Sequence, residues 1–527
     1  MKKLLLWLLS VIWTSCASAQ PTIEKYYQSA GSYQFNLIEL ASHHFFVGMG
    51  GAVLVDPQGN VIHNNYFFGD SIYSLQSVRN YSDNEFYFVA GYHKDSCTVI
   101  DPFTIPYTHP AIGKMDSLGN LLSLHYYELN AGACWNLPND LEVANDKSVI
   151  TWGNGGSGIA TTFFSLKADS NGALVWAKHF SNKGGFQFIR ELPGGDLLAG
   201  INMDTAGAVV ARLNATGDFI WCKSYIRPKG MVHDCLIESD SSFIITGFTD
   251  SIHGGVFYPP PPPFHPKLFM MKLNGAGDVQ WCRGYDSEYN WNVVRGSRIV
   301  KALDNDYIVL ANVRTQNSAQ PFLMKTDQNG DTLWTRSVGR SGYIYETTDL
   351  LACSDGGFLY DGDTYGDFSP WTGASYLFKT DSVGHLPCYE RWHAVQVSEL
   401  FPTDSSFTLT SVDGAVALPA FASDTIFGSI LVYDGCTFAT GMNPMQNRSF
   451  SVHPNPNTGR FTMEFKDPLA TESYYSVYDT MGRLLYQRPL PKGAMVEEID
   501  LSRFGKGTYV VKVTDKEGVC YERVVVE

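Results

Sequence analysis

The chain has 527 residues, with 53 acidic and 38 basic side chains and a formal net charge of −15. Charged residues make up only 17% of the sequence, whereas aromatic residues reach 14%. A disordered chain has the opposite balance, with many charges and few aromatic residues. The acidic excess argues against a nucleic-acid binder, because an acidic surface repels phosphate groups.

The N-terminus has the pattern of a secretory signal peptide. Two lysines precede an apolar run over residues 4–13, and Ala17-Ser18-Ala19 supplies the small residues of a cleavage site. We therefore expect residues 1–19 to be removed. A lipoprotein signal with Cys16 as the lipidated residue is the alternative. No segment reaches the roughly twenty apolar residues that a transmembrane helix needs.

The cysteines give no sign of a metal site. None of them forms a CxxC pair, so a structural zinc site is not expected. Cys222 and Cys235 are the nearest pair in the mature sequence. The sequence leaves their pairing open.

A short sequence motif recurs along most of the chain. It consists of an apolar run, Asp or Asn, two further residues, Gly, and often Trp four residues after the Gly. Asp or Asn hydrogen-bonds the backbone of its own turn, and Gly takes the positive φ that closes it. Each copy therefore predicts a β-hairpin. The glycines of the seven copies are Gly59, Gly119, Gly172, Gly217, Gly277, Gly330 and Gly384.

The period of this repeat, about 54 residues on average, is typical of four-stranded propeller blades with some long loops. We predict an all-β fold in which residues 20–440 form a seven- or eight-bladed β-propeller. Residues 407–410 and 429–435 would contribute an incomplete eighth hairpin, and an N-terminal strand around residues 33–40 would close the ring. An array of β-sandwiches is the alternative, although the period is short for a complete sandwich of about 100 residues.

The C-terminal region follows a different pattern. After a linker at residues 441–448, short alternating strands predict a small Ig-like β-sandwich over residues 449–527. Three motifs occur there in order: Pro-Asn-Pro with a later Gly, Asp-x-x-Gly-Arg, and Gly-x-Tyr. Their residues are Pro454, Asn455, Pro456, Gly459, Asp479, Gly482, Arg483, Gly507 and Tyr509.

These motifs resemble the type A C-terminal sorting domain of the type IX secretion system of Bacteroidota. Arg523 stands where Lys is usual before the final valines, a mild departure. The resemblance implies a route: entry into the periplasm through the signal peptide, then passage across the outer membrane by the type IX machinery. The domain is generally removed during export, and the cargo is either released or linked to surface lipopolysaccharide. The destination is thus the medium or the outer cell surface.

Catalytic motifs are absent from the sequence, which has no HExxH, GxSxG or GxxxxGK[ST]. The Asp residues of the repeat offer too few oxygens for calcium, which takes six to eight. We therefore expect no cofactor and no metal. Asp361, Asp363 and Asp367 form the densest acidic loop, which is the one place where calcium is considered.

Two insertions leave the repeat at the same point, one between Gly91 and Gly119 and one between Gly247 and Gly277. They should emerge on one face of the ring, and binding residues favour loops on a rigid scaffold. We treat them as candidate ligand-face loops, against the alternative of two surface loops without function. Their candidate residues are His93, Asp95, His109, His253 and His265.

Together these features favour a non-enzymatic exported protein that binds an unknown extracellular glycan or protein. The alternative is a secreted hydrolase or lyase that acts on polysaccharide at the axial opening. Such an enzyme would need two carboxyl groups within about 5 to 10 Å of each other. A structural layer component without a ligand is a third possibility.

Overall fold

The computed structural model divides the chain into two compact units, residues 1–436 and 437–527. Among the described residues every element is a β-strand except one 3₁₀ turn, η1 (Ser502–Phe504), so the all-β prediction is confirmed. The structure describes residues 22–28, 36–42, 44–48, 52–65, 72–82, 84–97, 105–129, 135–157, 160–181, 183–203, 207–225, 230–249, 266–287, 290–291, 297–314, 318–339, 343–365, 374–386, 390–391, 395–419, 431–434, 450–469, 473–479, 484–514 and 519–527.

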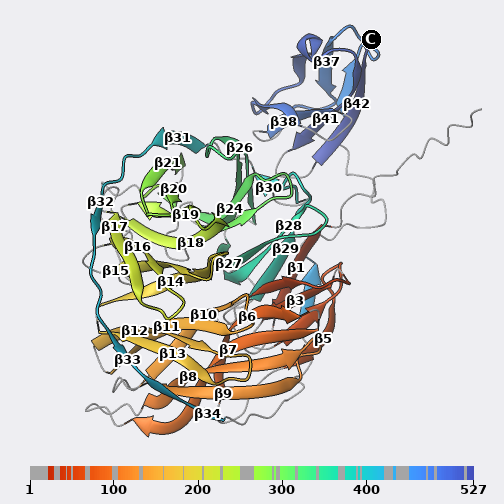
Figure 1. The fold of residues 1–527 in the computed structure, drawn as a ribbon. Coiled ribbons are helices and arrows are strands. Elements are labelled where there is room, and N and C mark those ends of the chain that lie inside the picture. Colours follow the sequence, from red (N-terminus) through yellow and green to blue (C-terminus); the bar gives the residue numbers. More distant parts are fainter. Residues whose placement is uncertain are drawn as a thin grey trace, which may run out of the picture. The chain divides into compact units, whose positions relative to one another are not determined.

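The described strands of the larger part fall into seven successive antiparallel groups, here called groups 1 to 7, and their order can be followed in Figure 1. Single parallel pairings join group 2 to group 3 and group 6 to group 7. Group 1 consists of β2 (Leu37–Glu39), β3 (Phe45–Gly48), β4 (Ala52–Val55) and β5 (Val61–Asn65). Group 2 consists of β6 (Ile72–Ser82), β7 (Glu85–Cys97), β8 (Ile105–Asp116) and β9 (Leu121–Leu129). Group 3 consists of β10 (Trp135–Val143), β11 (Val149–Ser157), β12 (Ala160–Ala168) and β13 (Leu174–Phe180).

The later groups follow the same plan. Group 4 consists of β14 (Gly184–Glu191), β15 (Leu197–Met203), β16 (Gly207–Leu213) and β17 (Phe219–Tyr225). Group 5 consists of β18 (Gly230–Ser239), β19 (Ser242–Thr249), β20 (Leu268–Asn274) and β21 (Val279–Ser287). Group 6 has a first strand in two pieces, β22 (Asn290–Trp291) and β23 (Arg298–Lys301), followed by β24 (Tyr307–Arg314), β25 (Ala319–Thr326) and β26 (Thr332–Val338). Group 7 combines β27 (Ile344–Ala352), β28 (Phe358–Tyr365) and β29 (Ala374–Lys379) with the N-terminal strand β1 (Ile23–Gln28).

The recurring turn has the chemistry that the sequence predicted. All seven turn glycines have a positive φ, between +76° and +84°. In group 1 the Asp56 carboxylate accepts hydrogen bonds from the backbone N–H of Gln58 at 2.9 Å and of Asn60 at 2.8 Å. The Asn214 side chain of group 4 does the same for Thr216 and Asp218. The turn is therefore fixed by contacts within five residues.

Each group packs its fourth strand against the turn of the next group. The indole N–H of Trp221 donates to the carbonyl oxygen of Gly275 at 3.0 Å, and the Tyr225 hydroxyl donates to Gly277 at 2.7 Å. The same kind of contact links Tyr27 of β1 to the Gly59 carbonyl of group 1 at 2.6 Å. Group 7 therefore contacts group 1 as each earlier group contacts its successor.

The first strands give a second sign of closure. Each lies beside the first strand of the following group, and β2 lies beside both β27 and β6. Groups 1 to 7 thus form a closed ring with β2, β6, β10, β14, β18, β23 and β27 innermost. Apolar clusters fill the spaces between neighbouring groups, such as the one that includes Phe163 and Phe180 of group 3 and Ile201 and Val209 of group 4.

Two details of the predicted closure were wrong. The strand that completes group 7 is β1, which pairs with β29, and not the stretch around residues 33–40. That stretch contains β2, the first strand of group 1. Ile23 pairs with Lys379, the position that Trp takes opposite Lys in group 3. This explains why the seventh copy of the repeat lacks its Trp.

The predicted eighth hairpin is also replaced by something else. The described part of residues 390–434, here called the strap, contributes single short strands that pair with the outer strands of other groups. They are β30 (Glu390–Arg391), β31 (Val395–Glu399), β32 (Asp404–Ser406), β33 (Ser411–Asp413), β34 (Ala415–Pro419) and β35 (Leu431–Asp434).

The smaller part has two antiparallel sheets. One contains β36 (Phe450–His453), β37 (Arg460–Phe465) and β40 (Val496–Asp500). The other contains β39 (Leu484–Leu490), β38 (Ser473–Asp479), β41 (Gly507–Thr514) and β42 (Val519–Val526). Met463 from the first sheet and Val477, Val511 and Val524 from the second belong to one buried cluster. In the described ranges of both parts, no helix has the length and apolar character to cross a membrane.

A pair of Gly→Ala variants separates turn strain from packing at the junctions. Gly195 has φ +89° and no atom within 4 Å of an added Cβ, so Gly195→Ala should cost only the left-handed strain, about 1 kcal/mol. At Gly277, φ is +76° and an added Cβ would lie 2.8 Å from the Trp221 ring. We expect Gly277→Ala to lose about 2–4 kcal/mol in urea unfolding. Equal losses in the two variants would contradict this packing role.

Candidate functional site

Polar side chains of the innermost strands form a network around the ring. The guanidinium of Arg79 on β6 lies 2.9 Å from Asp140 on β10 and also donates to Asn36, just before β2. Arg190 on β14 is 4.0 Å from Asp140 and 3.3 Å from Asp234 on β18. The network therefore joins the first strands of five consecutive groups.

The same network continues through groups 6 and 7 to its starting point. The backbone N–H of Ile299 on β23 donates to Asp234 at 3.1 Å, and Arg298 lies 4.0 Å from Asp349 on β27. The Asp349 carboxylate accepts a hydrogen bond from the N–H of Leu37 on β2 at 3.2 Å. All seven innermost strands are thereby linked.

β-Bulges in the first strands set the direction of these acids. The pairing of β10 with β11 shifts between Pro138 and Asp140, and that of β18 with β19 shifts between Val232 and Asp234. A bulge places one extra residue in the strand and re-aims the side chain that follows. Asp140 and Asp234 are the first paired residues after the two bulges, and their carboxylates both lie within 4.0 Å of the Arg190 guanidinium.

Two acids beside Arg190 have opposite pKa shifts. Burial raises the pKa of Asp140, but Arg79, Arg190 and the Ser77 hydroxyl together outweigh it, so its pKa lies below the usual value. For Glu142, 3.9 Å from Arg190, burial outweighs the attraction of the guanidinium and raises the pKa. Their side chains are 19% and 22% exposed, so the pair is not fully sealed from solvent.

The acidic stretch considered for calcium lies in a strand. Asp361 and Asp363 belong to β28, and the prediction of a loop at these two residues was wrong; Asp367 lies outside the described residues. Asp361 is fully buried, and its Oδ1 accepts a hydrogen bond from the N–H of Asp349 at 3.1 Å. Burial, reinforced by the charge of Asp349, raises the pKa of Asp361 well above its usual value. No group of three or more His, Cys, Asp or Glu in the described ranges is arranged to hold a metal ion.

This raised pKa predicts a pH-dependent stability. Because the folded pKa of Asp361 lies above the unfolded value of about 3.9, its contribution is fully present below the unfolded pKa and is lost as pH rises toward the folded pKa. We expect Asp361→Asn to raise the Tm at neutral pH and to flatten its fall between acidic and neutral pH. Calorimetry across this range tests the expectation.

Asp56 serves as the control of opposite sign. Burial is the largest single cause and raises its pKa, but hydrogen bonds from Asn60 and Gln58 and the charge of Lys25 together lower the pKa overall. Its contribution is present above the unfolded pKa and is lost as pH falls. Asp56→Asn should therefore lower the Tm at neutral pH and leave it unchanged in acid. A pH profile of Asp361→Asn parallel to that of the parent would refute the assignment.

The first predicted ligand loop is mostly an extension of the β7–β8 hairpin. His93 and Asp95 lie on β7 and His109 lies on β8, with His93 opposite Thr108 and His109 opposite Tyr92. Because successive side chains alternate across a strand, His93 and His109 lie on opposite faces of the hairpin. The His109 ring is buried, 5.6 Å from the Tyr126 ring. His253 and His265, from the second predicted loop, lie outside the described residues.

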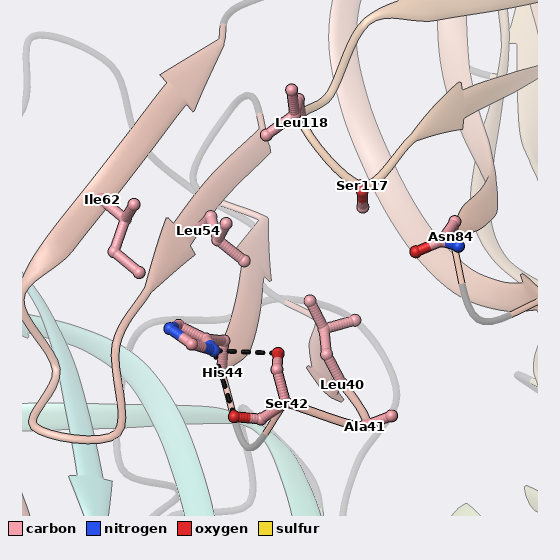
Figure 2. A pocket seen from close by; sticks show the side chains of 9 residues that line it. All are labelled: Leu40, Ala41, Ser42, His44, Leu54, Ile62, Asn84, Ser117 and Leu118. Atoms are coloured by element: carbon pink, nitrogen blue, oxygen red, sulfur yellow. Dashed lines mark hydrogen bonds between the residues drawn. The ribbon is translucent and has the colours of Figure 1, made fainter.

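A pocket of about 400 Å³ lies between group 1 and the turns of group 2 (Figure 2). Leu54 of β4 and Ile62 of β5 form one wall, and Leu118, from the β8–β9 turn, lies across from them. The remaining lining residues are Leu40, Ala41, Ser42, His44, Asn84 and Ser117. The His44 ring is held by hydrogen bonding with Ser42.

The pocket occurs where group 1 departs from the repeat. Two residues before the turn Asp or Asn, groups 3 to 7 carry Lys or Arg, and this residue forms an ion pair with an acid of its own first hairpin. Lys272 and Glu238, at 2.7 Å, are an example. Group 1 has Leu54 at this position, and His63 where the repeat has Trp. Aligning the seven copies would have revealed both substitutions, but our sequence analysis missed this site.

The residues of the C-terminal motifs hold the chain ends of the smaller part together. The Asn455 side chain donates to the carbonyl oxygen of Arg523 at 2.6 Å and accepts from the N–H of Val525 at 2.8 Å. The Tyr509 hydroxyl donates to the carbonyl oxygens of Phe504 and Gly505. Pro454 and Pro456 both follow cis peptide bonds.

The other motif residues occupy strand ends and turns. Gly459 has φ +101° and accepts a hydrogen bond from the N–H of Leu501 at 2.6 Å. Asp479 at the end of β38 pairs with Tyr509, and Gly507 pairs with Val526. Gly482 and Arg483 lie outside the described residues. The first and third motifs therefore act with the terminal strand β42.

Comparison with known proteins identifies this region. Residues 451–527 match the family model of the secretion system C-terminal sorting domain. They are a sorting domain of this family, as the motifs predicted, and the type IX machinery is implied as a partner. The domain directs export to the outer membrane or the cell surface.

The remaining comparisons are distant. No curated protein matches the chain. Similar solved structures include a protein of unknown function from Bacteroides caccae, with 8% identity over 72% of this chain and 98% of that chain and a TM-score of 0.32. Another is the polysaccharide lyase Uly1, with 8% identity over 67% of this chain and 90% of that chain and a TM-score of 0.38. Because both TM-scores lie below 0.5, neither likeness bears on the activity of this chain.

Proposed function

We propose that the larger part is a seven-bladed β-propeller that the sorting domain delivers to the cell exterior, where it acts as a binding module. The seven-fold closure is supported by the contacts of β2 with both β27 and β6 and by the Tyr27–Gly59 hydrogen bond between groups 7 and 1. We also infer that the sorting domain is an Ig-like sandwich, since its two sheets share one core.

The main support for a binding role is a difference between two places: the acids of the innermost strands are held by ion pairs and hydrogen bonds, whereas the pocket between groups 1 and 2 is open to a ligand. On the inner strands Asp140, Asp234 and Asp349 each accept from or pair with Arg or backbone N–H groups. Carboxylates held in this way stabilise the ring and are poorly placed to act on a substrate. The pocket between groups 1 and 2 instead has apolar walls and a polar edge, as ligand sites commonly do.

The pocket can be tested by adding bulk and charge at its wall. Leu118 is 48% exposed and lines the pocket, whereas Leu122 is 51% exposed on β9 and does not. The mature protein would be screened against panels of glycans and extracellular proteins, and the strongest binder carried forward. We expect Leu118→Arg to weaken that binding at least tenfold and Leu122→Arg to leave it unchanged. Equal binding by the two variants would refute the proposal that this pocket is the ligand-binding site.

The alternative of a polysaccharide hydrolase or lyase is favoured by one observation. Asp140 and Glu142, two residues apart on β10, have pKa values shifted in opposite directions, a common property of paired catalytic acids. An enzyme of this kind would release reducing ends or unsaturated products from extracellular polysaccharides. Glu142→Gln would abolish that release, while Glu191→Gln on β14 would not. Absence of products from the parent protein across such substrates would remove this alternative.

A further inference from the structure

The strap runs around the outside of the ring and meets groups 6 to 2 in descending order, opposite to their order in the sequence. β30 pairs with β26 of group 6, β31 with β21 of group 5 and β32 with β17 of group 4. β33 then pairs with β13 of group 3 and β34 with β9 of group 2, and β35 pairs with β1. Figure 1 shows β31 to β34 following one another along the outer edge of these groups.

Four ion pairs tie the strap to the outer strands. A basic residue on the fourth strand of groups 3 to 6 meets an acid of the strap in each case. The pairs are Lys178–Asp413 at 2.9 Å, Lys223–Asp404 at 3.0 Å, Arg283–Glu399 at 2.9 Å and Arg336–Glu390 at 3.0 Å. The basic residue lies six residues after the turn Gly each time, so the repeat itself carries the docking site for the strap.

Apolar side chains anchor the strap where it passes from one group to the next. Leu400, between β31 and β32, packs against the cluster shared by groups 4 and 5. Leu409, between β32 and β33, is 8% exposed in the cluster shared by groups 3 and 4. In contrast, Phe401 is 79% exposed, so only selected positions of the strap are buried. The anchors bridge adjacent groups, which couples strap docking to their packing.

The C-terminal strand of the strap, β35, lies beside β1. The pairing of β1 with β29, which joins the two ends of the ring, is here called the seam. β1 is the strand whose departure would open group 7, because it is the outer partner of β29 and comes from the opposite end of the sequence. β35 pairs with the other edge of β1, with Tyr26 opposite Tyr433 and Tyr27 opposite Val432. β1 is therefore held between β29 and the strap.

We propose that the strap is a clasp that docks on the finished ring and locks its seam. Its partner strands come from groups 2 to 7, so the docking surface is complete only after these groups have formed. Contacts between residues far apart in sequence form late, because closing long loops costs entropy. The strap ends before the matched sorting domain begins at residue 451, so removal of residues 451–527 would leave the clasp on the ring.

Hydrogen exchange of the full-length protein tests the clasp, with a strap variant and a matched ring variant. The strap variant combines Glu399→Gln, Asp404→Asn and Asp413→Asn. The ring variant combines Asp218→Asn and Asp278→Asn, which removes the other carboxylates bound by Lys178 and Lys223, at 2.8 and 2.6 Å.

We expect the strap variant to lower the protection of β35 and β1 at least tenfold while β15 and β19 keep that of the parent. The ring variant should leave β1 protected. Because exposed ion pairs are screened by salt, 1 M NaCl should also reduce the protection of β1 in the parent protein. The clasp is refuted if β1 keeps its protection in the strap variant, if the ring variant exposes β1 equally, or if β15 loses protection together with β1.

Discussion

Truncation of the chain after Asn447 is expected to abolish export and to retain the protein in the periplasm. The truncation removes all of the matched sorting domain, residues 451–527, and leaves the signal for entry into the periplasm in place. The ring belongs to a separate compact part, so its thermal unfolding should not change. Immunoblots of periplasm, cell surface and medium measure the outcome. Normal secretion of the truncated chain would contradict the assigned route.

Point variants within the sorting domain sharpen this prediction. Asn455→Ala removes both hydrogen bonds to β42, at Arg523 and Val525, and should reduce export. Arg460 is 80% exposed and forms an ion pair with Asp500, and it provides the control, since surface ion pairs contribute little. Arg460→Ala should be exported as the parent is. Equal export of the two variants would show that the Asn455 contacts are dispensable.

Arg190→Met should destabilise the ring by about 3–5 kcal/mol, because it removes the guanidinium that three partly buried acids share, and only Asp140 keeps the nearby cation of Arg79 among the contacts described above. Arg190 lies within 4.0 Å of Asp140, Glu142 and Asp234, which come from both neighbouring groups. Methionine keeps much of the side-chain volume, so the loss reports on charge more than on packing. The shift of the urea unfolding midpoint, at constant slope, measures the effect.

Arg212→Met is the matched control in the same group. Arg212 on β16 pairs with one acid, Asp196 at 2.8 Å, away from the innermost strands. Arg212 is about as buried as Arg190 but pairs with one acid instead of three, so this change should cost less, about 1–3 kcal/mol. If Arg190→Met and Arg212→Met unfold at the same urea concentration, the inner network does not hold the ring together.

Local chemistry explains which parts of the fold were predictable. The turn at Gly277 needs only Asn274, Gly277 and their immediate neighbours, so its sequence alone predicts a positive φ and the hairpin around it. The sorting domain was recognised in the same way, from short motifs at fixed order. The all-β class followed from repeating these local signals along the chain.

The closure of the ring depends on partners that are distant in sequence. β1 pairs with β29, more than 300 residues later, and nothing in Ile23–Gln28 itself specifies that edge. The seventh copy lacks the Trp, but so do the first and second copies, whose outer strands follow directly, so the repeat did not reveal which segment completes group 7. Strand pairing across such distances is decided by which edge remains open once the other strands have paired.

The candidate site was less predictable than the fold. His93 and His109 were grouped because both lie in the insertion between Gly91 and Gly119, yet strand alternation places them on opposite faces. The pocket is lined by Leu54 of group 1 and Leu118 of group 2, which are 64 residues apart, and it exists only where the two groups meet. The network around Arg190 likewise joins strands of separate groups.

The sequence alone determined the export route, the all-β class and the recurring turn, because each is written in contiguous residues whose chemistry acts over a few positions. Only the tertiary structure decided that β1 closes the ring, that residues 390–434 encircle it and that alternating Arg and Asp link the innermost strands. The physical reason is that these features depend on which strand edges and charges are left unpaired after all the local hairpins have formed.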